Sequence, residues 1–201
     1  MTAALFVILV TLTVSLVAFS KPSWTASLMF DTDAIRFRKE YHRFLSSALV
    51  HGSVMHLLFN LYAIFAFGHA LEGEIGGVNF AVLYLASIAG GDGLSWYKHR
   101  TGSYRSLGAS GGALGLIFSV ILISPHTMIF FVPAWLFGLI YVGYSAWAAQ
   151  RGAQHVGHYA HLGGAGIGFL LTALFKRGAV AEQPIIFVVL LIAFGIAAWM
   201  L

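Results

Sequence analysis

The longest uncharged run of the sequence, residues 106–150, restricts the fold more than any other feature. It contains 45 residues without Asp, Glu, Lys or Arg, and Pro125 interrupts it. Proline disfavours helix in the residue before it, so the run divides into two segments near Ser124. A helix needs about 17–25 residues to cross the hydrocarbon of a bilayer, and backbone groups in lipid must be satisfied within their own segment. We therefore predict two membrane-spanning helices in this run.

Charged residues and loops separate five further apolar runs. Together with the two halves of the longest run they give seven predicted spans: residues 2–20, 44–71, 75–91, 106–124, 126–150, 152–175 and 183–201. The first run lacks a basic leading segment and is long for a signal peptide, so we expect a true span. Polar loops are predicted at 21–43 and 92–105. The predicted fold is an all-α, polytopic membrane helical bundle, and the protein is expected to be an integral, multi-pass membrane protein.

Composition supports lipid as the solvent and limits the chemistry. The chain is 59% hydrophobic and only 9% charged, whereas soluble domains carry about 25% charged residues. The net charge of +4 comes from basic residues dispersed between apolar runs, which favours loops near lipid headgroups over a nucleic-acid surface. The absence of cysteine excludes disulfides and zinc–thiolate sites. Membrane lipids, and no nucleic acid, are therefore the expected surroundings.

Polar residues concentrate on alternate spans, which run in the same direction through the membrane. Spans two, four and six carry them near one face, whereas spans three, five and seven are nearly free of them: His51, His56, Asn60; Ser110; His155, His158, His161. His56 and Asn60 are four apart and share a helix face, as do His158 and His161, which are three apart. A polar cluster inside the membrane is by default a functional-site hypothesis.

Glycines on spans four and six predict close packing of these two helices. They occur at Gly108, Gly111, Gly112 and Gly115, and at Gly163, Gly164 and Gly168. Small residues allow helix backbones to approach each other in a membrane. We therefore expect Ser110 to come within hydrogen-bond reach of His161, which would pair a nucleophile with a base.

Other interpretations of the same residues remain open at this point. A GxSG sequence alone is weak, because small residues are common at helix interfaces, and Asn60 can simply join helices. The histidines could form a metal site, although there is no HExxH motif and His51 and His56 are five apart. A transporter with a histidine-lined path is a further alternative.

Three motifs together resemble the rhomboid family of intramembrane serine proteases. RFLSSALVHGSVMHLLFN at 43–60 resembles the family's loop-to-second-helix motif, GASG at 108–111 its nucleophile motif, and AHLGGAGIG at 160–168 its sixth-helix motif. One motif would be unspecific, but three in family order are specific. The resemblance implies a six-span catalytic core at 1–175 and an extra C-terminal span at 176–201.

The resemblance implies a serine endopeptidase with a Ser–His dyad that cleaves transmembrane protein substrates without cofactor or metal. Ser110 would attack the scissile carbonyl, and His161 would accept its proton and pass it to the leaving amine. The oxyanion would be held by the Ser110 backbone N–H and the side chains of His56 and Asn60. The alternative within the family is a catalytically silent protein that binds or chaperones membrane clients.

Supporting roles are implied for three further residues. His51 occupies another histidine position of the family, either structural or assisting the oxyanion hole, and Gly108 opens the nucleophile motif. Arg43 would fix the first loop to the core.

Two positions depart from the family pattern. Many members have Tyr or Phe four residues after the nucleophile, packed on the catalytic histidine, where this chain has Leu114. Support of His161 is then expected to be looser, or to come from Tyr159 or Tyr104. The residue before the loop arginine is often Trp, and here it is His42.

Orientation is predicted differently by two arguments. The family orientation places the N-terminus in the cytoplasm and the site on the outer side, with the plasma (inner) membrane as the expected location. However, nine of the eleven lysines and arginines fall in loops on the site face, which the positive-inside rule would place inside. We favour the family orientation. Substrate entry is expected beside span five, with Phe130, Phe131, Trp135 and Phe137 as its gate.

Overall fold

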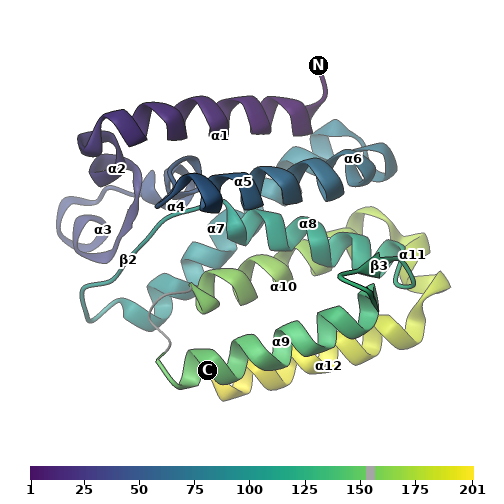
Figure 1. The fold of residues 1–201 in the computed structure, drawn as a ribbon. Coiled ribbons are helices and arrows are strands. Elements are labelled where there is room, and N and C mark those ends of the chain that lie inside the picture. Colours follow the sequence, from purple (N-terminus) through teal and green to yellow (C-terminus); the bar gives the residue numbers. More distant parts are fainter. Residues whose placement is uncertain (153–156) are drawn as a thin grey trace.

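Each of the seven predicted runs contains a helix in the computed structural model, which describes residues 1–152 and 157–201. The helices lie roughly along one direction (Figure 1). They are α1 (Ala3–Ser20), α5 (Val54–Ala63) with α6 (His69–Ile75), α7 (Gly77–His99), α8 (Ser110–Ile123), α9 (Ala134–Gln150), α10 (His158–Phe175) and α12 (Pro184–Met200). This confirms the predicted all-α helical membrane bundle with a seventh, C-terminal helix.

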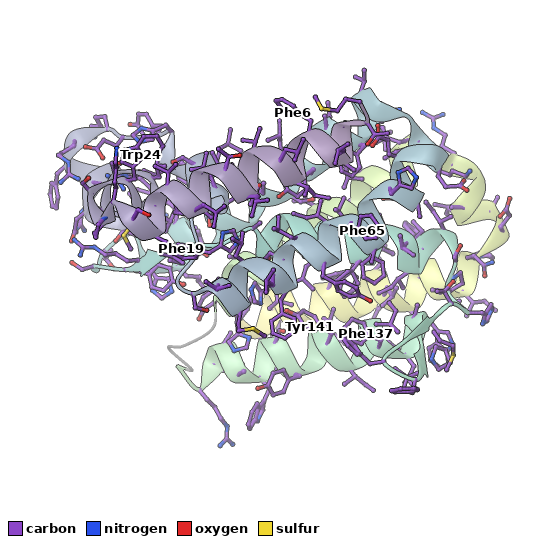
Figure 2. The ribbon with its side chains drawn as sticks, turned by 45° about the horizontal axis from the view of Figure 1, so that its top comes forward. Phe6, Phe19, Trp24, Phe65, Phe137 and Tyr141 are labelled. Atoms are coloured by element: carbon purple, nitrogen blue, oxygen red, sulfur yellow. The ribbon has the colours of Figure 1, made fainter. Side chains whose placement is uncertain are left out.

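Length and composition support membrane crossing. Within the described residues, three segments are long and apolar enough to cross a membrane: α1, the continuous helix Val54–Ile75 and α7. A short π-helical turn, η2 (Ile64–Gly68), joins α5 to α6 within the second of these. The helices α8 and α12 are shorter and apolar. Phe6 on α1 and Phe65 in η2 are 53% and 67% exposed on the outside of the bundle (Figure 2), as expected where lipid replaces water.

Shorter elements connect the long helices. The first loop contains α2 (Pro22–Leu28), β1 (Phe30–Asp31) and α3 (Thr32–Arg38), and α4 (Arg43–Ser46) and η1 (Ser47–Leu49) follow it. Strand β1 pairs antiparallel with β2 (Arg105–Ser106). A hairpin of β3 (Met128–Ile129) and β4 (Val132–Pro133) precedes α9, and α11 (Arg177–Glu182) precedes α12.

Three helices form the centre of the bundle. In Figure 1, α7, α8 and α10 lie between α1 with α5–α6 on one side and α9 with α12 on the other. A Cβ atom added to Gly164 of α10 would overlap the backbone of Gly111 on α8, and one added to Gly168 would overlap that of Gly115. The predicted glycine contact between these two helices is confirmed. Helix α7 takes part in it as well, because a Cβ on Gly91 would overlap the carbonyl oxygen of Ala160.

The second span begins later than the sequence predicted. The run 44–71 folds as α4, η1, a loop and then α5, which starts at Val54. Ser53 sets this start, because its side chain caps the helix by accepting the backbone N–H of His56 at 3.1 Å. His51 therefore lies in the loop before the span, and the expectation that it lies on the span is wrong.

The third span is longer than predicted. Helix α7 continues to His99, so a polar loop starting at residue 92 is wrong. Asp92 is buried inside the helix, where its carboxylate accepts the Ser47 hydroxyl at 2.6 Å. The prediction ends the span at this charged residue, but the hydrogen bond to Ser47 satisfies the Asp92 carboxylate within the bundle.

The residues proposed as a gate are divided between two places. Trp135 and Phe137 lie on α9, whereas Phe130 and Phe131 form the tip of the β3–β4 hairpin and are 80% and 95% exposed. This hairpin follows the end of α8 that is opposite Ser110. The expectation that Phe130 and Phe131 belong to span five is therefore wrong, because Pro133 ends the hairpin before the helix begins.

Gly164→Ala tests the glycine contact. The added methyl group has no space against the backbone of Gly111, and overpacking of this kind costs about 1–3 kcal/mol. We expect a lower thermal unfolding midpoint in detergent. Gly166→Ala is the matched control on the same helix, since its Cβ would lie 3.7 Å from the nearest atom of Phe194, an ordinary contact. Equal midpoints for the two variants would contradict close packing at Gly164.

Candidate active site

A cavity of about 650 Å³ brings the predicted polar residues together. Its lining includes Ser110, His161, His56 and Asn60, contributed by α8, α10 and α5. Phe59 of α5 lines the cavity and is itself 66% exposed. The cavity therefore reaches the side of the bundle at α5.

Ser110 and His161 are directly hydrogen-bonded. The Nε2 atom of His161 lies 2.7 Å from the Oγ atom of Ser110. Ser110 is the first residue of α8, rather than lying a few residues inside the span as predicted, and no side chain caps this helix end. Backbone N–H groups in the first turn of a helix have no acceptor within it and carry a partial positive charge. The serine is thus held where its own N–H can bind an anion.

His56 and Asn60 face the same cavity from one side of α5. The Asn60 side-chain amide donates to the His56 carbonyl at 2.8 Å, which leaves its second N–H for another acceptor. The His56 ring packs against Gly108, whose φ of +119° is one that side-chain-bearing residues rarely adopt. A Cβ atom at Gly108 would lie 2.5 Å from the ring, so the glycine is required for this contact.

His51 lies outside the cavity lining and is held by two hydrogen bonds. Its Nε2 accepts the backbone N–H of Ala109 at 3.2 Å, so that Nδ1 carries the proton. Nδ1 then donates at 2.9 Å to the Ser15 hydroxyl, which itself donates to the Leu49 carbonyl. His51 thereby joins the residue before Ser110 to α1, which is a structural position.

His158 lies beside His161 but does not line the cavity. Its buried ring packs edge-on with the rings of Tyr144 and His161, with centroids 6.0 Å and 6.3 Å away. His155 lies outside the described residues. Among the residues that the structure describes, no three His, Asp or Glu side chains converge as ligands for a metal ion.

The family model of the rhomboid domain matches residues 38–178, which include all of these cavity residues. The chain belongs to the rhomboid family. It is 33% identical to RHOMBOID-like protein 1 of Arabidopsis thaliana over 147 residues, which is 72% of this chain and 37% of that protein. It is 34% identical to mitochondrial Rhomboid protein 1 of Saccharomyces cerevisiae, over 63% of this chain and 39% of that protein.

A third rhomboid relative is bacterial. Rhomboid protease GlpG of Haemophilus influenzae is 28% identical over 132 residues, which is 65% of this chain and 68% of that protein. The chain spans less than half the length of RHOMBOID-like protein 1 and of the yeast protein. The family and the apolar helices make this chain an integral membrane protein. Its relatives include a bacterial protein and proteins named mitochondrial and chloroplastic.

Sequence reasoning missed the residue that supports the histidine of this rhomboid. Leu114 is buried on α8, and Tyr104 stacks on His99 while the Tyr159 hydroxyl donates to Ala149, so neither tyrosine holds His161. The hydroxyl of Tyr141 on α9 instead lies 2.9 Å from the Nδ1 atom of His161. No motif marks Tyr141, because a tyrosine in an apolar span reads as an ordinary packing aromatic. Span five was expected to be nearly free of such groups, which is wrong at Tyr141.

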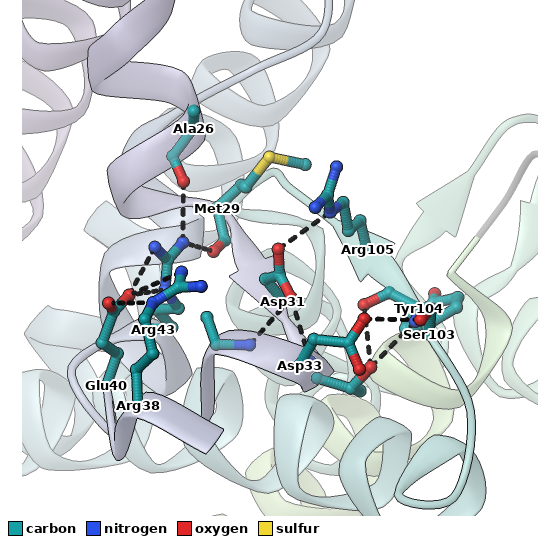
Figure 3. A network of polar contacts seen from close by, with 12 residues as sticks. Ala26, Met29, Asp31, Asp33, Arg38, Glu40, Arg43, Ser103, Tyr104 and Arg105 are labelled. Carbon is teal, nitrogen blue, oxygen red and sulfur yellow. Dashed lines mark hydrogen bonds and ion pairs between the residues drawn. The ribbon is translucent and has the colours of Figure 1, made fainter. Parts of the chain in front are cut away.

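Arg43 lies at the centre of a polar network in the first loop (Figure 3). Its guanidinium is 3% exposed and donates to the carbonyls of Ala26 at 2.9 Å and Met29 at 2.6 Å. It also pairs with Glu40 at 2.6 Å, which Arg38 contacts from the other side. The loop is thereby fastened to α4.

A second set of contacts in Figure 3 joins this loop to the segment before Ser110. Asp31 of β1 pairs with Arg105 of β2 at 2.8 Å and caps α3 by accepting the N–H groups of Asp33 and Ala34. Burial alone would raise the pKa of Asp31, but the hydrogen bonds from Ala34 and Arg105 outweigh it and lower the pKa. Hydrogen bonds from Arg38 and Arg43 lower the pKa of Glu40 to about 2.

Acid should loosen this loop. The pKa of Glu40 is lower in the folded chain than its ordinary value of about 4.3. The ionised Glu40 carboxylate therefore stabilises the fold above about pH 4.3, and this stabilisation is lost as the pH falls toward 2. We expect the thermal midpoint in detergent to fall between about pH 5 and pH 2, and Glu40→Gln to reduce this pH dependence. Glu182→Gln, at the exposed end of α11, is the control. An unchanged pH dependence in Glu40→Gln would contradict the assignment.

Proposed function

We propose that this chain is an intramembrane serine endopeptidase that cleaves transmembrane-helix substrates with a Ser110–His161 dyad. The observation that carries the proposal is the 2.7 Å contact between His161 Nε2 and Ser110 Oγ inside a cavity. A nucleophile within hydrogen-bond reach of a base is what acyl transfer requires. Support also comes from the relative in Haemophilus influenzae, whose name is Rhomboid protease GlpG.

In the acylation step, Ser110 Oγ attacks the scissile carbonyl carbon while its proton passes to His161 Nε2. The carbonyl oxygen becomes an oxyanion, held by the Ser110 N–H at the start of α8, by the free N–H of Asn60 and by the ring of His56. The tetrahedral intermediate collapses, the C–N bond breaks, and His161 gives the proton to the leaving amine.

Deacylation repeats these steps with water. His161 accepts a proton from a water molecule as its oxygen attacks the acyl carbon of the Ser110 ester. The ester bond breaks, Ser110 Oγ takes the proton from His161, and the product leaves as a carboxylic acid that then loses its remaining proton to water. The cavity, which is lined by polar as well as apolar groups, is large enough to hold that water beside the substrate. No cofactor or metal ion takes part in the proposed reaction.

Substrates are proposed to enter from the lipid between α5 and α9. Phe59 of α5 is part of the cavity wall and is itself exposed, which supports a route from lipid to Ser110 on this side. A peptide bond within a regular helix is shielded by its own turns, and glycine and other helix-weakening residues reduce the cost of unwinding. Transmembrane helices with such residues near the cleavage site are the proposed substrate class.

Cleavage of a model transmembrane substrate in liposomes tests the proposed activity. We expect Ser110→Ala and His161→Ala each to lower kcat by at least roughly a thousandfold, since the two residues act as one unit. Ser124→Ala, at the exposed end of the same helix, should cleave like the wild type. Cleavage that survives in Ser110→Ala would contradict the dyad, and a wild type without cleavage would favour the silent client-binding alternative.

A reporter fused after Leu201 tests orientation. The N-terminus and the C-terminus lie at opposite ends of the bundle (Figure 1), as seven spans require. With the N-terminus in the cytoplasm we expect the reporter on the outer side, together with Ser110. A cytoplasmic C-terminus would contradict the family orientation and agree with the distribution of basic residues. The plasma membrane stays a prediction, because relatives include proteins named mitochondrial and chloroplastic.

A further inference from the structure

Both ring nitrogens of His161 are engaged. Nε2 lies 2.7 Å from Ser110 Oγ on α8, and Nδ1 lies 2.9 Å from the Tyr141 hydroxyl on α9. The imidazole is therefore held between two helices at once, in line from Tyr141 through His161 to Ser110. A base that is oriented by a third group is the general form of activated nucleophiles.

The direction of the two hydrogen bonds follows from the reaction. Ser110 can give its proton to His161 only if Nε2 has a free lone pair, so Nδ1 must carry the ring proton. Nδ1–H then donates to the Tyr141 oxygen, which selects the reactive tautomer.

Tyr141 is itself held by aromatic packing. Its ring stacks on Phe137 with centroids 5.8 Å apart (Figure 2) and meets the edge of Phe118 on α8 at 6.1 Å. These contacts fix the ring, so its hydroxyl has little freedom to leave His161. On α8 the residue four positions after Ser110 is Leu114, which supplies no hydrogen-bonding group.

We infer that Tyr141 is a positioning residue that holds His161 in the tautomer and orientation needed to act as base. This inference rests on the proposed proteolysis. The arrangement differs from a two-residue dyad because a third residue, Tyr141, orients the base. This residue comes from α9, the helix beside the proposed entry. Outward movement of α9 would separate the Tyr141 hydroxyl from Nδ1, so full positioning of the base depends on α9 returning to the bundle.

Tyr141→Phe isolates the hydroxyl, because the phenylalanine ring keeps the packing against Phe137 and Phe118. Tyr144→Phe is the matched control, since Tyr144 lies on the same helix and is 58% exposed. For cleavage of the model transmembrane substrate in liposomes, we expect Tyr141→Phe to lower kcat on the order of tenfold with KM within about twofold. Tyr144→Phe should change neither constant, and both variants should keep the wild-type thermal midpoint within about 2 °C.

Two outcomes would overturn the inference. One is a Tyr141→Phe enzyme with wild-type kcat, which would show that the hydroxyl does not position the base. The other is a rise in KM with unchanged kcat, which would make Tyr141 part of substrate binding. Failure of the proposed function is distinct, because the wild type itself would then show no Ser110-dependent cleavage.

Discussion

The backbone contact between α8 and α10 determines where Ser110 and His161 lie. Gly111 and Gly115 on one helix meet Gly164 and Gly168 on the other, with no space for a Cβ atom on Gly164 or Gly168. Helices pack in lipid through such van der Waals contacts rather than through the hydrophobic effect. Since Ser110 starts α8 and His161 lies one turn into α10, the same contact brings their side chains within 2.7 Å. The glycines therefore allow the two helices to pack closely, and this packing sets the distance between Ser110 and His161.

The first loop attaches to this centre from outside. Strand β1 pairs with β2, four residues before Ser110, and Arg43 fastens the other part of the loop through two carbonyls and Glu40. His51 adds a further link, from the residue before Ser110 to α1. The entry to α8 is thereby held from several sides, while Gly108 alone allows the chain to turn against His56. We infer that these contacts keep the anion-binding N–H of Ser110 in a fixed position.

Much of this arrangement could be predicted from the sequence, because it depends on the length of the uncharged runs and on the direction in which successive spans cross the membrane. Uncharged runs indicated the seven helices, and the rule that alternate spans are parallel placed His56, Ser110 and His161 near one face. The failures have a common physical cause, since local pattern does not report tertiary hydrogen bonds. Asp92 was read as the end of a span but is satisfied by Ser47, and Tyr141 is recognised only once α9 is packed beside α10. The hairpin at Phe130 and Phe131 could not be predicted, because its apolar residues continue the uncharged run and resemble part of a membrane-spanning helix.

The central claim is that Ser110 is an activated nucleophile. The most direct measurement is treatment of the full chain in liposomes with a fluorophosphonate, followed by peptide mapping of the adduct by mass spectrometry. The structure predicts one adduct, on Ser110, which is lost in His161→Ala although Ser110 itself is still present. An adduct on another serine, or labelling that does not depend on His161, would contradict the account.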